Sequence, residues 1–107
     1  MALFYKHTGL QEQYGEILQE KQKFDAHLIK KYVKGSVTYL ELTTGLVMFV
    51  NRSAQILHIH FNALATRTVW NSGLIDTAIY GDVLVLDYSE IDDSLQFLRK
   101  EQGSEIA

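Results

Sequence analysis

The stretch from Leu46 to Phe61, LVMFVNRSAQILHIHF, constrains the fold more than any other part of the chain. Residues 47–50 are apolar at every position, which is typical of a β-strand covered on both faces. Residues 56–61 alternate, so that one set of side chains forms a fully apolar face and the other a mixed one. We therefore expect two core strands here, joined by a polar turn at residues 51–54.

The chain on either side of this stretch also predicts strands. Residues 36–42 have a period of two and are rich in β-branched and aromatic residues. The turn that links them to residues 46–50 is too short for a parallel crossover, so we expect an antiparallel hairpin. A second hairpin is predicted from residues 74–80 and 83–88, because the Gly81-Asp82 dipeptide between them suits a type II′ turn. Residues 83–86 are apolar at every position, so we expect this last strand to be central in the sheet or covered by helices.

Residues 62–70 fit two structures. A helix would have Asn62 as its N-cap, whereas a strand would place the threonines and Trp70 on one face. We favour the strand, and the helix remains the alternative.

Helices are expected near both ends. From Leu10 to Tyr32 apolar residues recur at steps of three and four, which predicts an amphipathic helix beginning near Thr8 and followed by Gly35. Two helices, or one helix broken near residues 20–23, also fit this pattern, and a strand over residues 24–33 is a further alternative. Ser89 with Asp92 predicts the start of a short final helix, with residues 103–107 as a loose tail.

Together these patterns predict one α+β domain over residues 1–107. It would contain an antiparallel meander sheet of five to six strands, a long N-terminal helix and a short C-terminal helix, both packed on one face. With a helix at residues 62–70, the element order looks like that of the small acidic dimeric chaperones of bacterial secretion systems. That similarity is one of element order, and no residue motif carries it.

Composition and missing motifs exclude several classes of function. The chain has no cysteine, which excludes disulfides and thiol catalysis. It has no signal-peptide pattern and no apolar run near the ~18 residues that span a bilayer, so we expect a cytoplasmic protein without membrane contact. The net charge of −3 disfavours nucleic acid as the main ligand, although lysines gather between residues 21 and 34. No phosphate-binding, dinucleotide or nucleophile motif occurs, so no reaction and no cofactor is indicated.

His58 and His60 are the best candidates for metal ligands. Residues two apart on a strand point to the same side and can hold one ion. A strand's polar face also carries two histidines by simple alternation, and no spacing provides further ligands. The carboxylates of residues 87–93 are a second candidate, for Ca²⁺ or Mg²⁺, but the start of a helix explains them without an ion.

Protein binding is the function that the composition favours. The chain has six tyrosines, five phenylalanines and one tryptophan, and aromatic side chains are enriched at interfaces. We predict a non-enzymatic binding protein, an inhibitor, immunity protein or chaperone, that forms a homodimer. The expected surface comprises Tyr32, Tyr39, Trp70 and Tyr80. The alternative is a small-molecule or metal-binding protein, with weak enzymatic activity, that uses the His58/His60 face.

Overall fold

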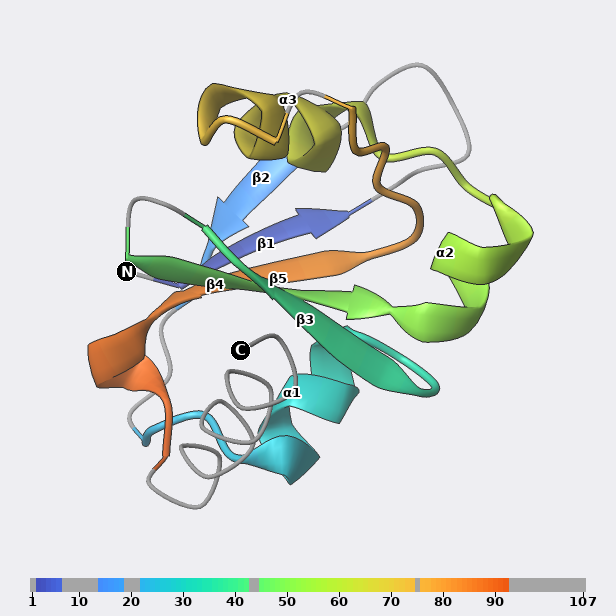
Figure 1. Ribbon diagram of the computed structural model, residues 1–107. Helices are drawn as coiled ribbons and strands as arrows, with labels where there is room; N and C mark the ends of the chain where they lie inside the picture. The colour runs from blue at the N-terminus through green and yellow to red at the C-terminus, as the bar shows by residue number, and fades with distance from the viewer. Residues whose placement is uncertain (1, 7–13, 19–21, 43–44, 75, 93–107) are drawn as a thin grey trace, which may run out of the picture.

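The computed structural model describes residues 2–6, 14–18, 22–42, 45–74 and 76–92. The strands formed by these residues are β1 Leu3–Lys6, β2 Tyr14–Ile17, β3 Val37–Glu41, β4 Leu46–Asn51 and β5 Val83–Asp87. The helices are α1 Ala26–Tyr32, α2 Arg52–Leu57, α3 Ala63–Asn71 and the 3-10 turn η1 Tyr88–Glu90. Each pairing between these strands is antiparallel, and the sheet order is β2-β1-β5-β4-β3 (Figure 1). The fold is therefore α+β with an antiparallel sheet.

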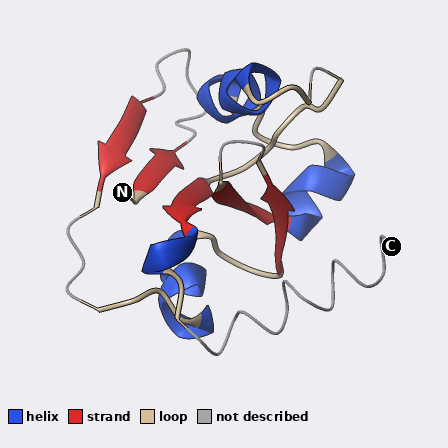
Figure 2. Cartoon of the chain, turned by 60° about the vertical axis from the view of Figure 1, so that its left-hand side comes forward, coloured by secondary structure: helices blue, strands red, loops and turns tan. Residues whose placement is uncertain are grey.

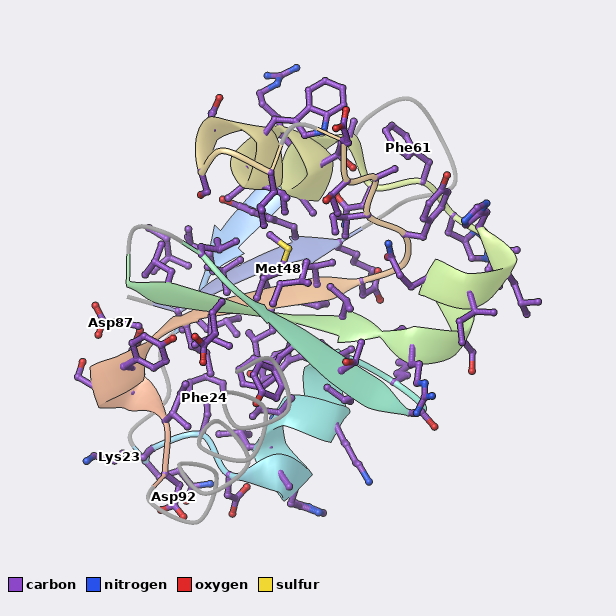
Figure 3. All side chains as sticks on the ribbon, viewed as in Figure 1. Lys23, Phe24, Met48, Phe61, Asp87 and Asp92 are labelled. Atoms are coloured by element: carbon purple, nitrogen blue, oxygen red, sulfur yellow. The ribbon has the colours of Figure 1, made fainter. Side chains whose placement is uncertain are left out.

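The sheet is the middle layer of three, with α1 on one face and α3 on the other (Figures 1 and 2). Side chains of the central strands alternate between two apolar clusters. Phe24 lies in the cluster beside α1, and Met48 lies in the cluster beside α3 (Figure 3). The residues of β4 and β5 on the α1 face are Val47, Phe49, Leu84 and Leu86. Those on the α3 face are Met48, Val50, Val83 and Val85.

This arrangement confirms what the two most apolar stretches predicted. Residues 47–50 and 83–86 are buried at every position, and β5 lies in the middle of the sheet. The predicted hairpin between β3 and β4 is also confirmed, with Tyr39 opposite Phe49. A strand that is apolar on both pleat faces needs cover on both sides, and α1 and α3 supply it.

The predicted long N-terminal helix is wrong. Residues 14–17 form a strand paired with β1, and the only helix among the described residues before Val37 is the seven-residue α1. The apolar periodicity merged two separate elements into one stripe. Gly15 disfavours helix in the first of them, and Asp25 caps the second by accepting a hydrogen bond from the Leu28 N–H at 2.8 Å. The strand alternative for residues 24–33 is excluded as well.

The predicted meander is also wrong, because three of its segments are not strands. Residues 52–57 are helix α2, residues 63–71 are helix α3, and residues 76–80 make only an isolated bridge from Tyr80 to Phe61. The hairpin at Gly81 therefore does not form, although Gly81 has a positive φ of 81°. The helix alternative for residues 62–70 is correct, but the chaperone-like element order that accompanied it is not observed.

Two asparagines explain why the chain turns to helix after β4. Asn51 accepts a hydrogen bond from the Ala54 N–H at 2.9 Å, and Asn62 accepts one from the Ala65 N–H at 3.1 Å. Each side chain satisfies one of the free N–H groups at a helix start. Described helices cover both faces of the sheet, α1 one face and α3 the other, whereas the prediction placed its helices on a single face. The predicted helix start at Ser89 and Asp92 is wrong, because residues 88–90 form only the 3-10 turn η1 and the Asp92 N–H donates to the Phe24 carbonyl at 2.9 Å. Residues 93–107, with the rest of the predicted C-terminal helix and the tail, lie outside the described residues, as does the capping pattern at Thr8.

Asn62 is fully buried and joins three parts of the fold. Its Nδ2 donates to the carbonyl oxygens of Tyr5 in β1 and Gly81 before β5, each at 2.8 Å. Its backbone N–H donates to the Ile79 carbonyl at 2.9 Å. A buried polar side chain is stable only when its hydrogen bonds are made, so this residue fixes where α3 sits on the sheet.

We expect Asn62→Ala to lower the free energy of unfolding by roughly 3 to 5 kcal/mol, because the buried Gly81 carbonyl and the partly buried Tyr5 carbonyl lose their donor and α3 loses its cap. Asn51→Ala is the matched control, since it removes the equivalent cap from α2 together with an exposed hydrogen bond from Nδ2 to the Lys34 carbonyl, and it should cost only about 1 to 2 kcal/mol. Urea unfolding of both variants measures the difference. Equal losses would contradict the role given to the buried amide.

Candidate functional site

The segment Ile56–Phe61, which we call the connector, comprises the last two residues of α2 and the turn that leads toward α3. It is the most apolar exposed stretch of the described surface. Ile56 and Leu57 are each 66% exposed, Phe61 is 49% exposed and Ile59 is 44% exposed. Phe61 lies at the periphery of the molecule, between α3 and α2 (Figure 3). Isolated exposed apolar residues are ordinary, but four within six residues form a patch that indicates an interaction site.

The backbone of the connector is strained at two histidines. His58 ends α2 in the left-handed region with φ 54° and ψ 47°, and His60 has φ 62°. The N–H groups of His58 and Ile59 both donate to the Ala54 carbonyl, which closes the end of the helix. Left-handed φ costs a side chain that is not glycine roughly 1 kcal/mol. The surrounding contacts must hold this conformation.

Tyr80 supplies those contacts. The His58 ring stacks on the Tyr80 ring with centroids 4.9 Å apart and planes 14° apart, and Phe61 meets the same ring edge-on at 5.7 Å. The Gly81 N–H donates to the His60 carbonyl at 2.8 Å. The connector therefore contacts residues 80–81, which precede β5, through His58, His60 and Phe61.

Gln55 and Gly81 hold α2 against the loop of residues 77–81, which precedes β5. Gln55 Oε1 accepts the Tyr80 N–H at 3.0 Å, and its Nε2 donates to the Ala78 carbonyl. A Cβ on Gly81 would lie 3.0 Å from the Cβ of Ala54 and would also require the unfavourable φ of 81°. Only glycine allows α2 to approach this closely.

Trp70 stands at the far end of this loop. It is 50% exposed on α3, and its indole N–H donates to the Thr77 carbonyl at 2.8 Å. Leu74, which follows α3, is 37% exposed. The loop from Thr77 to Tyr80 thus has Trp70 at one end and the Phe61 ring at the other.

The four aromatic residues predicted as a binding surface do not lie together. Tyr32 packs against Phe4 at 5.3 Å between ring centroids, and Tyr39 packs against Phe49 at 6.0 Å, both half-buried on the α1 face. Trp70 and Tyr80 belong to the part of the molecule built from α2, α3 and their loop. Binding by any of the four residues stays a prediction.

The physical basis of the predicted metal site is absent, because His58 and His60 lie in a turn and not on adjacent rungs of a strand. Across the part of the chain that the structure describes, no group of three His, Cys, Asp or Glu side chains is placed to hold a metal ion. Metal binding by the pair stays a prediction without further geometric support.

The carboxylates after β5 have a local role. Asp87 accepts the Ser89 N–H at 3.0 Å, and Glu90 Oε1 accepts the Asp87 N–H at 2.9 Å, which is a capping box at η1. Hydrogen bonds from the Ser89 backbone and side chain lower the pKa of Asp87 from its ordinary value. The capping of η1 therefore accounts for Asp87 and Glu90 without an ion. The lysines that cluster between residues 21 and 34 are exposed where the structure describes them: Lys23, Lys30, Lys31 and Lys34. Lys21 lies outside the described residues.

Comparisons with protein-family models, curated proteins and solved structures gave no match. Within the described ranges, no helix has the length and apolar character needed to cross a bilayer. The geometry of the connector is therefore the main guide to function.

We expect Gly81→Ala to lower the free energy of unfolding by roughly 2 to 4 kcal/mol, because it adds both a strained φ and an overlap with Ala54. Gly45→Ala is the matched control, since Gly45 has a similar φ of 83° and nothing within 4 Å of an added Cβ. It should cost only about 1 kcal/mol, the strain alone. Thermal or urea unfolding separates the two effects, and a Gly81 variant no worse than the Gly45 variant would refute the close contact.

Proposed function

We propose that the protein is a non-enzymatic protein-binding module of the inhibitor, immunity or chaperone kind, which acts as a homodimer and presents the connector to its partner. The observation that carries the proposal is the exposure of the apolar side chains of Ile56–Phe61. These side chains have no place in either core cluster, although burying them would be favourable.

The connector offers enough energy for specific binding. Fully burying one large aliphatic or aromatic side chain contributes about 1.5 to 3 kcal/mol, and four such side chains here are about half exposed. Covering them would contribute on the order of 3 to 6 kcal/mol before the costs of association. Ile56 and Leu57 have the most to gain because they are the most exposed.

The connector is also organised in advance. Left-handed residues other than glycine concentrate at functional sites, and this segment contains two, His58 and His60. Their conformation is fixed by the stack on Tyr80 and by backbone hydrogen bonds, so little further order has to be imposed on binding. Histidine is one of the residue types that tolerates this region best.

The chemistry of the partner follows from the connector's composition. The side chains of residues 56–61 include no lysine, arginine or carboxylate, so the matching surface should be apolar at its centre. Beside Ile59 lies a hollow of about 240 Å³, bordered by the charged residues Lys34 and Asp82. A single partner side chain that enters this hollow would fix the orientation of the complex.

We expect Leu57→Asp to weaken a purified, stoichiometric partner complex by at least about thirtyfold, the effect of losing a central apolar contact. The protein should remain folded, because Leu57 is 66% exposed. Trp70→Glu, also at an exposed position, tests whether the surface extends along α3. The partner is identified by affinity co-purification at moderate salt, and affinities are then measured by calorimetry with the purified components.

Ile17→Asp is the matched control for this experiment. Ile17 is 56% exposed and lies on edge strand β2, outside the connector. Its substitution by aspartate should leave partner affinity unchanged. A Leu57→Asp variant that binds as well as the Ile17→Asp variant would overturn the assignment of the connector as the binding surface.

A further inference from the structure

Strand β3 is one edge of the sheet, and its hydrogen-bond pattern shows which peptide groups face outward. The Arg52 N–H donates to the Ser36 carbonyl and the Leu42 N–H donates to the Leu46 carbonyl, each at 2.8 Å. Along a strand of an antiparallel pair, the backbone N–H and C=O groups of one residue bond the partner strand, and those of the next residue point away from it. The even-numbered residues of β3 therefore bond β4, and the peptide groups of Val37, Tyr39 and Glu41 point away from β4, to the side where no described strand pairs with β3.

Strand β3 lacks several of the features that usually prevent pairing, and Glu41 is its one charged residue. The strand VTYLE contains no proline and no lysine, and its register with β4 runs without a bulge from Val37 to Glu41. It is also rich in residues that favour strands. Exposed edges of this kind pair with another strand unless they are blunted.

We infer that a second copy of this chain pairs antiparallel with β3, so that two sheets join edge to edge across a two-fold axis at Tyr39. The outward peptide groups fix the register: Val37 lies opposite the partner's Glu41, and Glu41 lies opposite the partner's Val37. The inference rests on the homodimer proposed above and assigns its interface.

Charge complementarity supports a second copy of the chain as the partner of β3. On the α1 face, a cavity of about 420 Å³ lies beside β3, lined by Val37, Tyr39 and Phe49 and bordered by the cations Lys30 and Arg52. Glu41 has the same parity as Val37 and Tyr39, so its side chain lies on that same face of the sheet. In the two-fold pairing each Glu41 comes beside the Val37 end of the other copy, where these cations lie.

A parallel pairing is less favourable because of the same charges. A parallel pairing of two β3 strands would place Glu41 beside Glu41, and like charges directly opposite are destabilising. The antiparallel pairing forms two equivalent ion pairs, one at each end of the new junction. Because the contact is a single short strand pair, we expect a weak dimer, with a dissociation constant on the order of micromolar.

The test is the concentration dependence of mass, measured by sedimentation or light scattering on the full chain. Glu41→Lys and Arg52→Glu should each raise the dissociation constant at least about tenfold, because each places like charges together. The double variant Glu41→Lys with Arg52→Glu exchanges the charges and should recover most of the affinity. Glu41→Pro, which removes an outward N–H that β4 does not use, should give a monomer with an unchanged circular dichroism spectrum.

The outcomes separate this interface from the function proposed above. A chain that stays monomeric at every concentration would overturn both the β3 interface and the homodimer. A dimer that survives Glu41→Pro and ignores the charge exchange would overturn the β3 interface and leave the homodimer standing. Leu57→Asp should leave the dissociation constant unchanged, and a dimer that it disrupts would show that the connector, not β3, joins the copies.

Discussion

The fold depends on the buried hydrogen bonds of Asn62. Its amide reaches β1 and the loop before β5, while its backbone begins α3, so one residue positions a helix against strands that are distant in sequence. Apolar contacts alone would let α3 slide over the flat cluster that includes Met48 and Val85. Hydrogen bonds to two fixed carbonyls have one geometry, so they select a single position for the helix.

That position has consequences for the surface. Because Asn62 caps α3, the chain has only the residues between Leu57 and Asn62 in which to run from the end of α2 to the sheet. The left-handed turns at His58 and His60 make this crossing, and they leave Ile56, Leu57 and Phe61 outside both clusters. The exposed apolar connector is thus a result of how α3 is anchored, and the binding function proposed for it uses a surface that the fold already creates.

The sequence predicted the parts of this structure in which local pattern and burial agree. Residues 47–50 and 83–86 were expected in the core, and the β3–β4 hairpin was expected from its short turn, because continuous apolar runs and loop length have few alternatives. The connector was mistaken for a core strand because its alternation fits a strand. What decides against the strand is the cap at Asn51, which starts α2 first. Asp25 and Asn62 cap the other two described α-helices in the same way, so an Asp or Asn cap in the sequence indicated where each of these helices begins. The exposure of Ile56 and Leu57 follows from tertiary packing, which periodicity does not contain.

The most direct test of this account is the reactivity of a single cysteine placed in the connector. The chain has no native cysteine, so Leu57→Cys and Val85→Cys each carry one thiol, the first at a position 66% exposed and the second at a position 1% exposed. In native buffer, the thiol at position 57 should react with a labelling reagent about as fast as in the unfolded chain, and the thiol at position 85 should be strongly protected. Protection of both would place the connector in the core and contradict the account.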